Sequence, residues 1–256
     1  MISSASHQVI GTGVRSLATA LAAGLLAVIA VGGPAGQLLA NDAVQGRVDL
    51  NFIVGVPQDE FRDKVEENGG GAGVTGTLDL GRKSPMALGV SLGYMNYGSE
   101  TRHEPFSSTI PDVTVEVNTS NNIVLGHAVL RLQPWGGTLK PYLDGLLGFS
   151  YLFTETTIKD EDGDEEVASS TNLDDTVLSY GIRTGVIVGV YTSTPQDPSA
   201  HPYSISIDVG ASYLVGGEAG YLKKGSIRRD GGKVAYDITR SRTNLAIYHI
   251  GITLSR

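Results

Sequence analysis

His127, Asp144 and Ser150 are side chains whose types could combine in nucleophilic catalysis. A serine nucleophile needs a histidine within hydrogen-bond distance and an acid that orients the histidine. The alternation of residue types around all three predicts that they face the interior of a closed sheet, where a histidine with satisfied hydrogen bonds is the simpler interpretation. We therefore predict no catalytic residue and no cofactor. A hydrolase that uses His127 is kept as an alternative.

The acidic segment 160–166 begins like a calcium-binding loop, with acids at its first, third and fifth positions: Asp160, Asp162 and Asp164. Such a loop also needs a glycine at position six and a bidentate glutamate at position twelve. The chain has Glu165 and Thr171 there. The segment is therefore predicted to be a solvated loop tip, and we predict no metal site in the chain. Surface contacts and weak divalent-cation binding are the functions that this tip could serve.

A basic segment near the end of the chain is the second candidate for surface contacts. Its sequence is GGEAGYLKKGSIRRDGGK, and its cations are Lys223, Lys224, Arg228 and Arg229. In an outer membrane the phosphates of lipopolysaccharide lie at the level of such a loop, and clustered cations attract them. An ordinary exposed loop explains the same residues equally well.

The segment 140–157, KPYLDGLLGFSYLFTETT, indicates which element positions these residues. One face carries Leu143, Leu147, Phe149, Tyr151 and Phe153, and the other carries Tyr142, Asp144, Gly148, Ser150 and Thr154. A period of two predicts a strand, because successive side chains of an extended chain point to opposite sides. A long aromatic face opposite small polar residues is typical of a strand that separates lipid from a polar barrel interior.

Eight segments show this alternation: 48–56, 72–80, 86–97, 113–132, 140–157, 177–191, 203–215 and 234–254. The links between them alternate in length. Those at 57–70, 98–112, 158–176 and 216–233 are all longer than those at 81–85, 133–139 and 192–202. Outer-membrane barrels have short periplasmic turns and longer external loops. We therefore predict an all-β fold, a closed antiparallel up-and-down transmembrane β-barrel of eight strands.

The predicted inward face carries charged residues that could form an ion-pair network: Asp49, Asp79, Arg131, Asp144, Arg183 and Asp208. The interior of an eight-stranded barrel is just wide enough for side chains to fill it, and buried charges need partners. Arg131 and Asp144 both face inward only if the paired residues of the fourth and fifth strands have numbers whose sum is odd. Inward glycines, including Gly148 and Gly185, are expected to make room for larger neighbours.

Composition and the first residues limit the remaining choices. Residues 1–40 combine Arg15 with a short apolar run and predict a signal peptide ahead of a barrel domain at 45–256. The chain has no cysteine, which excludes disulfides and thiolate metal sites. Its formal net charge of -8 argues against nucleic-acid binding.

From Val48 onward the chain resembles the small eight-stranded outer-membrane barrels, the OmpA/OmpX-like group. The motifs that carry the resemblance are Gly55-Val56-Pro57 with Phe61, PYLDGLLGFSYL, GGEAGYLKKGSI and Ser241-Arg242-Thr243-Asn244. The resemblance implies a location in the cell outer membrane, contact with membrane lipid and lipopolysaccharide, and a monomer. Many members end in an aromatic residue, whereas Leu254-Ser255-Arg256 stand here.

The resemblance is weak for activity, and the external partner stays unknown. The predicted function is that of a non-enzymatic membrane protein whose external loops stabilise the envelope or make surface interactions. The alternatives are a barrel-embedded lipid hydrolase that uses His127, a narrow channel and a soluble lipocalin-like binder.

Overall fold

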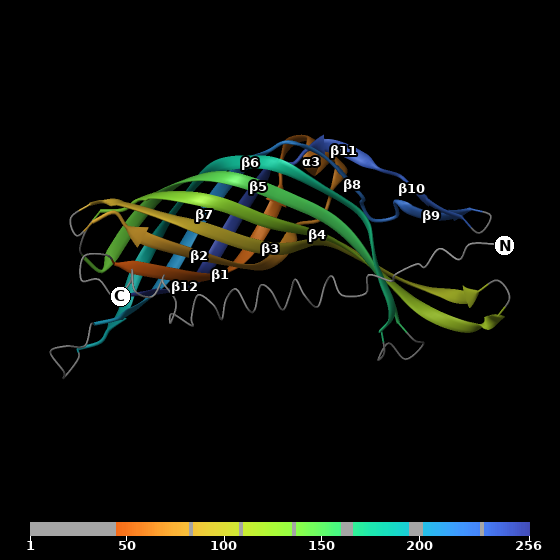
Figure 1. Ribbon diagram of the computed structural model, residues 1–256, viewed down its shortest axis with the longest axis horizontal. Helices are drawn as coiled ribbons and strands as arrows, with labels where there is room; N and C mark the ends of the chain where they lie inside the picture. The colour runs from red at the N-terminus through yellow and green to blue at the C-terminus, as the bar shows by residue number, and fades with distance from the viewer. Residues whose placement is uncertain are drawn as a thin grey trace, which may run out of the picture.

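The computed structural model describes residues 45–81, 84–107, 110–134, 137–159, 166–194, 202–230 and 233–256. Within them, eight antiparallel strands close into a barrel, in the order β1-β12-β7-β6-β5-β4-β3-β2 (Figure 1). The strands are β1 (Gly46–Pro57), β2 (Gly69–Asp79), β3 (Met86–Ser107), β4 (Ile110–Leu132), β5 (Leu139–Lys159), β6 (Glu166–Thr192), β7 (Ser204–Gly216) and β12 (Leu245–Ser255). The predicted fold class is confirmed. The signal peptide predicted at 1–40 lies outside the described residues.

The two faces of the barrel follow the alternation that the sequence predicts. On β5, the Leu147 side chain is 60% exposed on the outside, whereas Asp144 is 0% exposed in the interior. Arg131 of β4 is the direct register partner of Asp144, so the paired numbers have an odd sum as predicted. Apolar side chains are also exposed on the outward faces of the other strands, among them Phe52, Val90, Leu178, Val209 and Ile250. The part of the chain that the structure describes contains no helix long and apolar enough to cross a bilayer.

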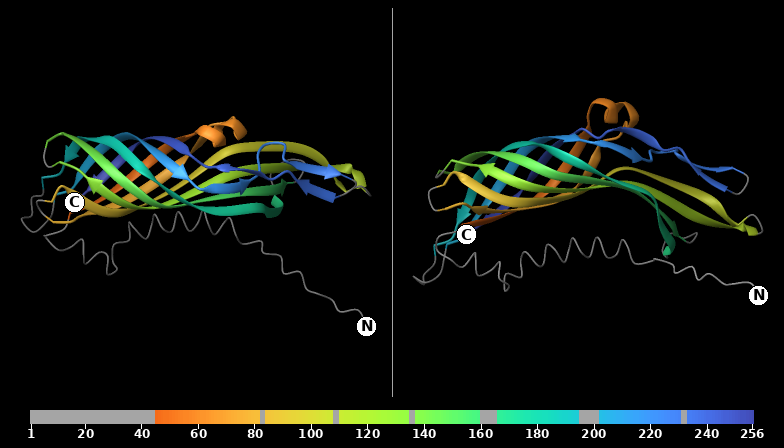
Figure 2. Two further views of the ribbon diagram at one scale, coloured as in Figure 1. Left: turned by 90° about the horizontal axis from the view of Figure 1, so that it is seen from above. Right: turned by 45° about the horizontal axis from the view of Figure 1, so that its top comes forward.

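Several predicted links are not loops, and this part of the prediction was wrong. The pairing of β3 with β4 continues to Ser107 and Ile110, and the pairing of β5 with β6 continues to Lys159 and Glu166. These extensions project beyond one end of the barrel (Figure 2). Backbone pairing needs no apolar face, so a polar hairpin continues as strand after the hydrophobic alternation has ended.

The first and last long links also contain regular structure. Helix α3 (Asp59–Lys64) lies in the link between β1 and β2. The link before β12 contains β8 (Glu218–Tyr221), β9 (Ile227–Asp230), β10 (Lys233–Tyr236) and β11 (Thr239–Arg242). These elements lie at the end of the barrel opposite the C-terminus (Figure 1). The eighth barrel strand therefore begins at Leu245 instead of 234, because the residues before it pair within this link as β9–β10 and β8–β11.

Inward glycines serve two purposes in the barrel. A Cβ at Gly185 would lie 2.5 Å from the Tyr142 hydroxyl, so this glycine makes room for the Tyr142 ring, as expected. At Gly148 the constraint is backbone approach, because a Cβ there would overlap the carbonyl oxygen of Gly126. The expectation of room for large side chains is therefore correct at Gly185 and incomplete at Gly148.

A pair of alanine substitutions on one strand tests this close approach. We expect Gly148→Ala to destabilise the barrel by about 1–3 kcal/mol, because β4 or β5 must shift to accommodate the methyl group. Gly145→Ala is the matched control, since that glycine faces outward and its Cβ would come no closer than 4.0 Å to a neighbouring atom. Urea titration of the folded gel band measures both. Equal midpoints for the two variants would contradict the account.

Candidate functional site

The barrel interior contains a fully buried ion pair that crosses the lumen. The guanidinium of Arg131 on β4 donates through Nε to Asp144 Oδ1 at 2.8 Å and through Nη1 to Asp49 Oδ2 at 3.1 Å. Asp144 is on the neighbouring β5, whereas Asp49 is on β1, with β2 and β3 between it and β4 in the ring. Arg183 Nη1 on β6 lies 3.6 Å from Asp144 Oδ2 and extends the group. Of the predicted network, the structure brings these four residues together.

Asp79 lies apart from this group and has a partner that the sequence analysis did not name. Arg47 Nη2 donates to both Asp79 oxygens, at 2.8 and 3.0 Å, and Arg47 also bonds Gln133. The predicted set of six residues is therefore more than one network. Arg47 shows the same alternation as Asp49 on β1, two residues earlier, so its inward position could have been found from the sequence.

Asp208 belongs to the predicted network, but its partners in the structure are a tyrosine and a histidine instead of an arginine. Tyr142 donates its hydroxyl to Asp208 Oδ1 at 3.0 Å, and His249 Nε2 lies 3.4 Å from Asp208 Oδ2. The same Tyr142 hydroxyl is 2.9 Å from His249 Nε2. Among the described residues no arginine makes an ion pair with Asp208. The Tyr142 ring reaches this position and also lies under Arg131, whose Cζ is 4.2 Å from the ring centroid.

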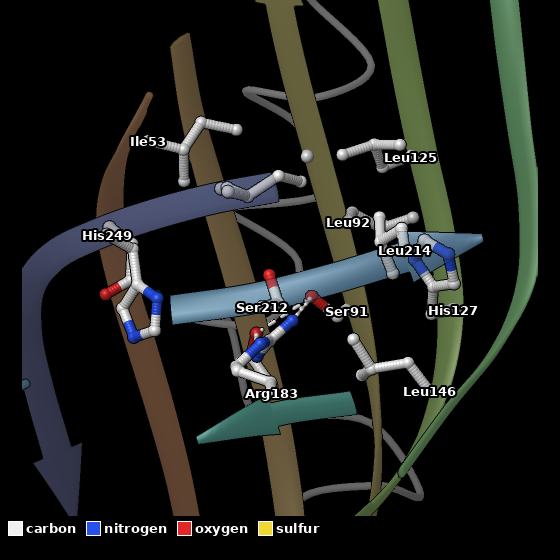
Figure 3. Close-up of a pocket in the computed structure, with 15 residues that line it drawn as sticks. Ile53, Ser91, Leu92, Leu125, His127, Leu146, Arg183, Ser212, Leu214 and His249 are labelled. Carbon is white, nitrogen blue, oxygen red and sulfur yellow. Dashed lines mark hydrogen bonds between the residues drawn. The ribbon is translucent and has the colours of Figure 1, made fainter. Parts of the chain in front are cut away.

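A small cavity of about 40 Å³, lined by both polar and apolar side chains, lies beside these groups (Figure 3). Figure 3 shows His249 and His127 at opposite sides of the cavity, with Arg183 and Ser91 between them. Asn51 also lines it, and its Oδ1 is a buried acceptor without a partner in the described structure. At roughly 10–15 Å³ of such volume for one water, the cavity suits a few water molecules and excludes an organic ligand.

His127, Asp144 and Ser150 do not form the arrangement that a hydrolase needs. His127 Nε2 lies 2.5 Å from the Oγ atom of Ser179, and Ser179 is 0% exposed. Asp144 accepts its hydrogen bonds from Arg131 instead of orienting the histidine. The only hydroxyl that contacts His127 is thus sealed from substrate within the described barrel. In the part of the chain that the structure describes, no group of histidines and carboxylates could hold a metal ion.

An aromatic cluster closes the mouth of the barrel at the end where α3 lies, and sequence reasoning missed it. Phe61 of α3 is 0% exposed, with its ring centroid 5.9 Å from that of Tyr97 and 5.2 Å from that of Tyr221, both edge-on. The Tyr97 hydroxyl donates to the Leu222 carbonyl at 3.5 Å. Phe61 and Val65 are four residues apart, which is the helical spacing that could have revealed this short element.

Helix α3 is held against the rim of the barrel by polar contacts of its first turn. The Asp59 carboxylate accepts from Asn244 Nδ2 at 2.8 Å and from the Tyr213 hydroxyl at 3.0 Å. These bonds, first that of Asn244, hold the pKa of Asp59 below its ordinary value. Glu60 Oε2 accepts from the backbone N–H of Arg242 on β11. The mouth is therefore closed by a helix that is fastened to β7, to β11 and to Asn244 just before β12.

The predicted surface residues are only partly within the described chain. Asp160, Asp162 and Asp164 lie outside it. Lys223 and Lys224 lie in the turn after β8, and Lys224 Nζ is 3.4 Å from Glu67 Oε1. Arg228 and Arg229 belong to β9, where they are the register partners of Ala235 and Val234.

Comparisons with known proteins find similarity of fold only. No family model matches the chain, and no curated protein matches it. Among solved structures, Neisserial surface protein A is 12% identical over 83% of this chain and 95% of its own, with a TM-score of 0.34. Ail of Yersinia pestis is 13% identical over 84% and 98%, with a TM-score of 0.32. A major outer membrane protein from Thermus thermophilus is 10% identical over 82% and 99%, with a TM-score of 0.33. These similarities assign no activity to the chain.

Alanine substitutions of the interior carboxylates test the geometry of the site. Asp144→Ala leaves Arg131 with one of its two carboxylates, and we expect a loss of about 3–5 kcal/mol in the free energy of unfolding. Asp208→Ala removes an acceptor of Tyr142 and should cost about 1–3 kcal/mol. Asp63→Ala, on the exposed side of α3, is the control and should change stability by about 0.5 kcal/mol or less. Denaturant titration ranks the three variants, and a larger loss for Asp208→Ala than for Asp144→Ala would refute the assignment of partners.

Proposed function

We propose that this chain is an integral protein of the cell outer membrane, delivered there by the signal peptide at 1–40. Exposed apolar side chains on the outward faces of the strands, among them Phe52, Leu147 and Ile250, form a belt around the barrel. This belt supports the proposal, since such a surface would be unstable in water. Tyrosines lie at both ends of the belt, as at membrane interfaces. The Tyr94 hydroxyl donates to Asn122 Oδ1 at 2.8 Å, whereas the Tyr191 and Tyr203 rings are 6.0 Å apart at the opposite end. A soluble lipocalin-like binder has no need of this belt.

The filled interior favours a function outside the lumen. Ion pairs occupy the half of the barrel that contains Asp49 and Arg131, and apolar side chains such as Leu125, Leu146 and Leu214 occupy the next layer. The aromatic cluster around Phe61 covers the mouth. Conduction would require all three layers to rearrange, so the narrow channel is the weaker candidate.

The observation that carries the proposed function is the polar sheet outside the belt. Strands β3 to β6 continue to 107, 110, 159 and 166 and stay paired with one another. Their side chains are cross-linked by hydrogen bonds, as between Thr119 and Thr156 at 3.1 Å and between Asn172 and Thr156 at 2.6 Å. An ordered polar sheet on a closed barrel supports a non-enzymatic protein that makes external contacts. We propose that these contacts are with lipopolysaccharide or with a partner outside the cell, and that the barrel acts as a monomer.

The membrane location predicts a depth-dependent cost of charge on the outer face. Leu147→Arg, in the middle of the belt on β5, should destabilise the barrel by about 2–4 kcal/mol. Leu254→Arg, at the end of β12, should cost about 0–1 kcal/mol. Unfolding titrations in phospholipid vesicles measure both, and equal costs would argue against the belt. Recovery of the wild-type protein as a soluble periplasmic species would overturn the location.

Trimming two external hairpins tests the proposed function. Thr157 and Ser169 are register partners, as are Ile227 and Tyr236, so each pair can be joined by an Asn-Gly turn that replaces the residues between them. We expect both trimmed barrels to keep the heat-dependent gel shift of the wild type and to lose lipopolysaccharide binding and cell adhesion. Binding that survives both deletions would refute these hairpins as contact surfaces. Lipid hydrolysis abolished by His127→Ala, or steady conductance altered by Arg183→Ala, would instead establish one of the rival functions.

A further inference from the structure

A second, larger cavity opens at the outer mouth, above the aromatic cluster, and has a volume of about 290 Å³. It is formed by the end of α3 and the link after it, by β3 and β4, and by the turn between β8 and β9. Its lining residues are Lys64, Val65, Glu66, Glu67, Tyr97, Gly98, Asn121, Lys223 and Lys224. Cavities that bind small molecules have volumes of about 300–1,000 Å³, so this one suits an occupant as small as a monosaccharide.

The cavity is blind, because its floor belongs to the closed mouth. Tyr97 is only 3% exposed and packs edge-on against Phe61 and Tyr221. Asn121, 3% exposed, is fixed by the hydroxyl of Thr154, which donates to its Oδ1 at 2.7 Å. A solute that enters from outside is therefore held at the mouth and does not pass into the lumen.

The turn that carries two of the lysines is preorganised. Ser226 N–H donates to the Lys223 carbonyl at 3.0 Å, and Lys223 N–H donates back to Ser226 Oγ at 3.2 Å. Gly225 has a φ of 79° and donates its N–H to Glu100 Oε2 on β3 at 3.0 Å. The turn is thus fastened to the β3 extension, which lowers the entropy cost of ordering it around a ligand.

The charges around the cavity favour an anion. Lys224 Nζ lies 3.4 Å from Glu67 Oε1, so these two opposite charges offset each other in the charge balance of the cavity. Lys64 and Lys223 remain, and the ammonium group of neither makes a hydrogen bond or an ion pair within the described structure. Among the lining residues, Glu66 is then the single carboxylate opposed to two free ammonium groups. Ammonium groups bind phosphate as point charges, whereas Glu66 and the amide of Asn121 are suited to hydroxyl groups.

We propose that this cavity binds a small sugar that carries a phosphate group, with the phosphate between Lys64 and Lys223 and the hydroxyls toward Glu66 and Asn121. This goes beyond the surface contacts proposed above. It is tested separately, because the purified full-length barrel in detergent suffices for the measurement. Lipopolysaccharide binding is measured on the trimmed barrels, whereas sugar phosphate binding is measured on cavity variants of the full-length barrel. The proposed function and the proposed cavity ligand can therefore fail independently.

Isothermal titration with glucose 6-phosphate is the direct experiment. We expect saturable one-site binding to the wild type, and a loss of affinity of about tenfold or more when Lys64→Gln and Lys223→Gln are combined, since two charge-assisted contacts disappear. Arg62→Gln is the matched control. It removes the same charge from the same helix, at a residue that does not line the cavity, and should leave the affinity unchanged within about twofold.

A second variant blocks the cavity without removing charge. A Cβ at Gly98 would lie 3.5 Å from Asn121 Nδ2 and 3.6 Å from Glu67 Oε2, which is ordinary contact, so Gly98→Leu should fold and fill the space. We expect it to abolish binding while the heat-dependent gel shift is retained. Absence of saturable binding by the wild type, or an equal loss in Arg62→Gln, would overturn the proposal. If inorganic phosphate bound as tightly as glucose 6-phosphate, the sugar part of the proposal would be overturned. If bound glucose 6-phosphate were displaced only by lipopolysaccharide, the phosphate recognised would be that of a lipid headgroup.

Discussion

The ion pair of Arg131 with Asp49 and Asp144 is the contact on which the barrel interior depends. A guanidinium removed from water is stable only when its donors meet fixed acceptors, and here the two carboxylates come from β1 and β5. Arg131 and Asp144 are register partners, so the pair also determines how β4 lies against β5. A slip of one residue between β4 and β5 would leave Arg131 and Asp144 on opposite faces of the sheet, with one of the two charges turned toward lipid. The same contact therefore holds opposite walls of the barrel together and selects one register.

The rest of the interior is arranged around this group. Tyr142 lies under the Arg131 guanidinium and hydrogen-bonds Asp208, and it has room to do so because residue 185 is glycine. Above these polar residues the lumen becomes apolar, and then the aromatic cluster of α3 and β8 closes it. The two ends thus differ in chemistry. Charged side chains fill one end. The other end is covered by α3, and the blind cavity lies beside this helix.

The sheet outside the belt follows from a different constraint. In lipid, only an apolar outward face is stable, so the sequence alternates strictly. Outside lipid that requirement disappears, and threonine, serine and asparagine side chains hydrogen-bond across strands, as Thr119 does with Thr156 at 3.1 Å. The backbone pairing of β3 to β6 continues without interruption, although the hydrophobic pattern has ended. This continuity gives the external part of the molecule an ordered surface.

The sequence by itself determined which residues face lipid and which face the interior, because a period of two is a local property of the chain. The eight strands, the inward positions of Arg131, Asp144 and Asp208, and the outward position of Leu147 all follow from it. The partners of the interior charges did not, since Asp79 meets Arg47 and Asp208 meets Tyr142 and His249 only through the stagger of strands around the closed ring. The aromatic closure around Phe61 of α3 and the lysine-lined cavity were also decided by tertiary structure. They join the link after β1 to residues more than a hundred positions later, such as Tyr221 and Lys223, and no local pattern encodes a contact over that separation.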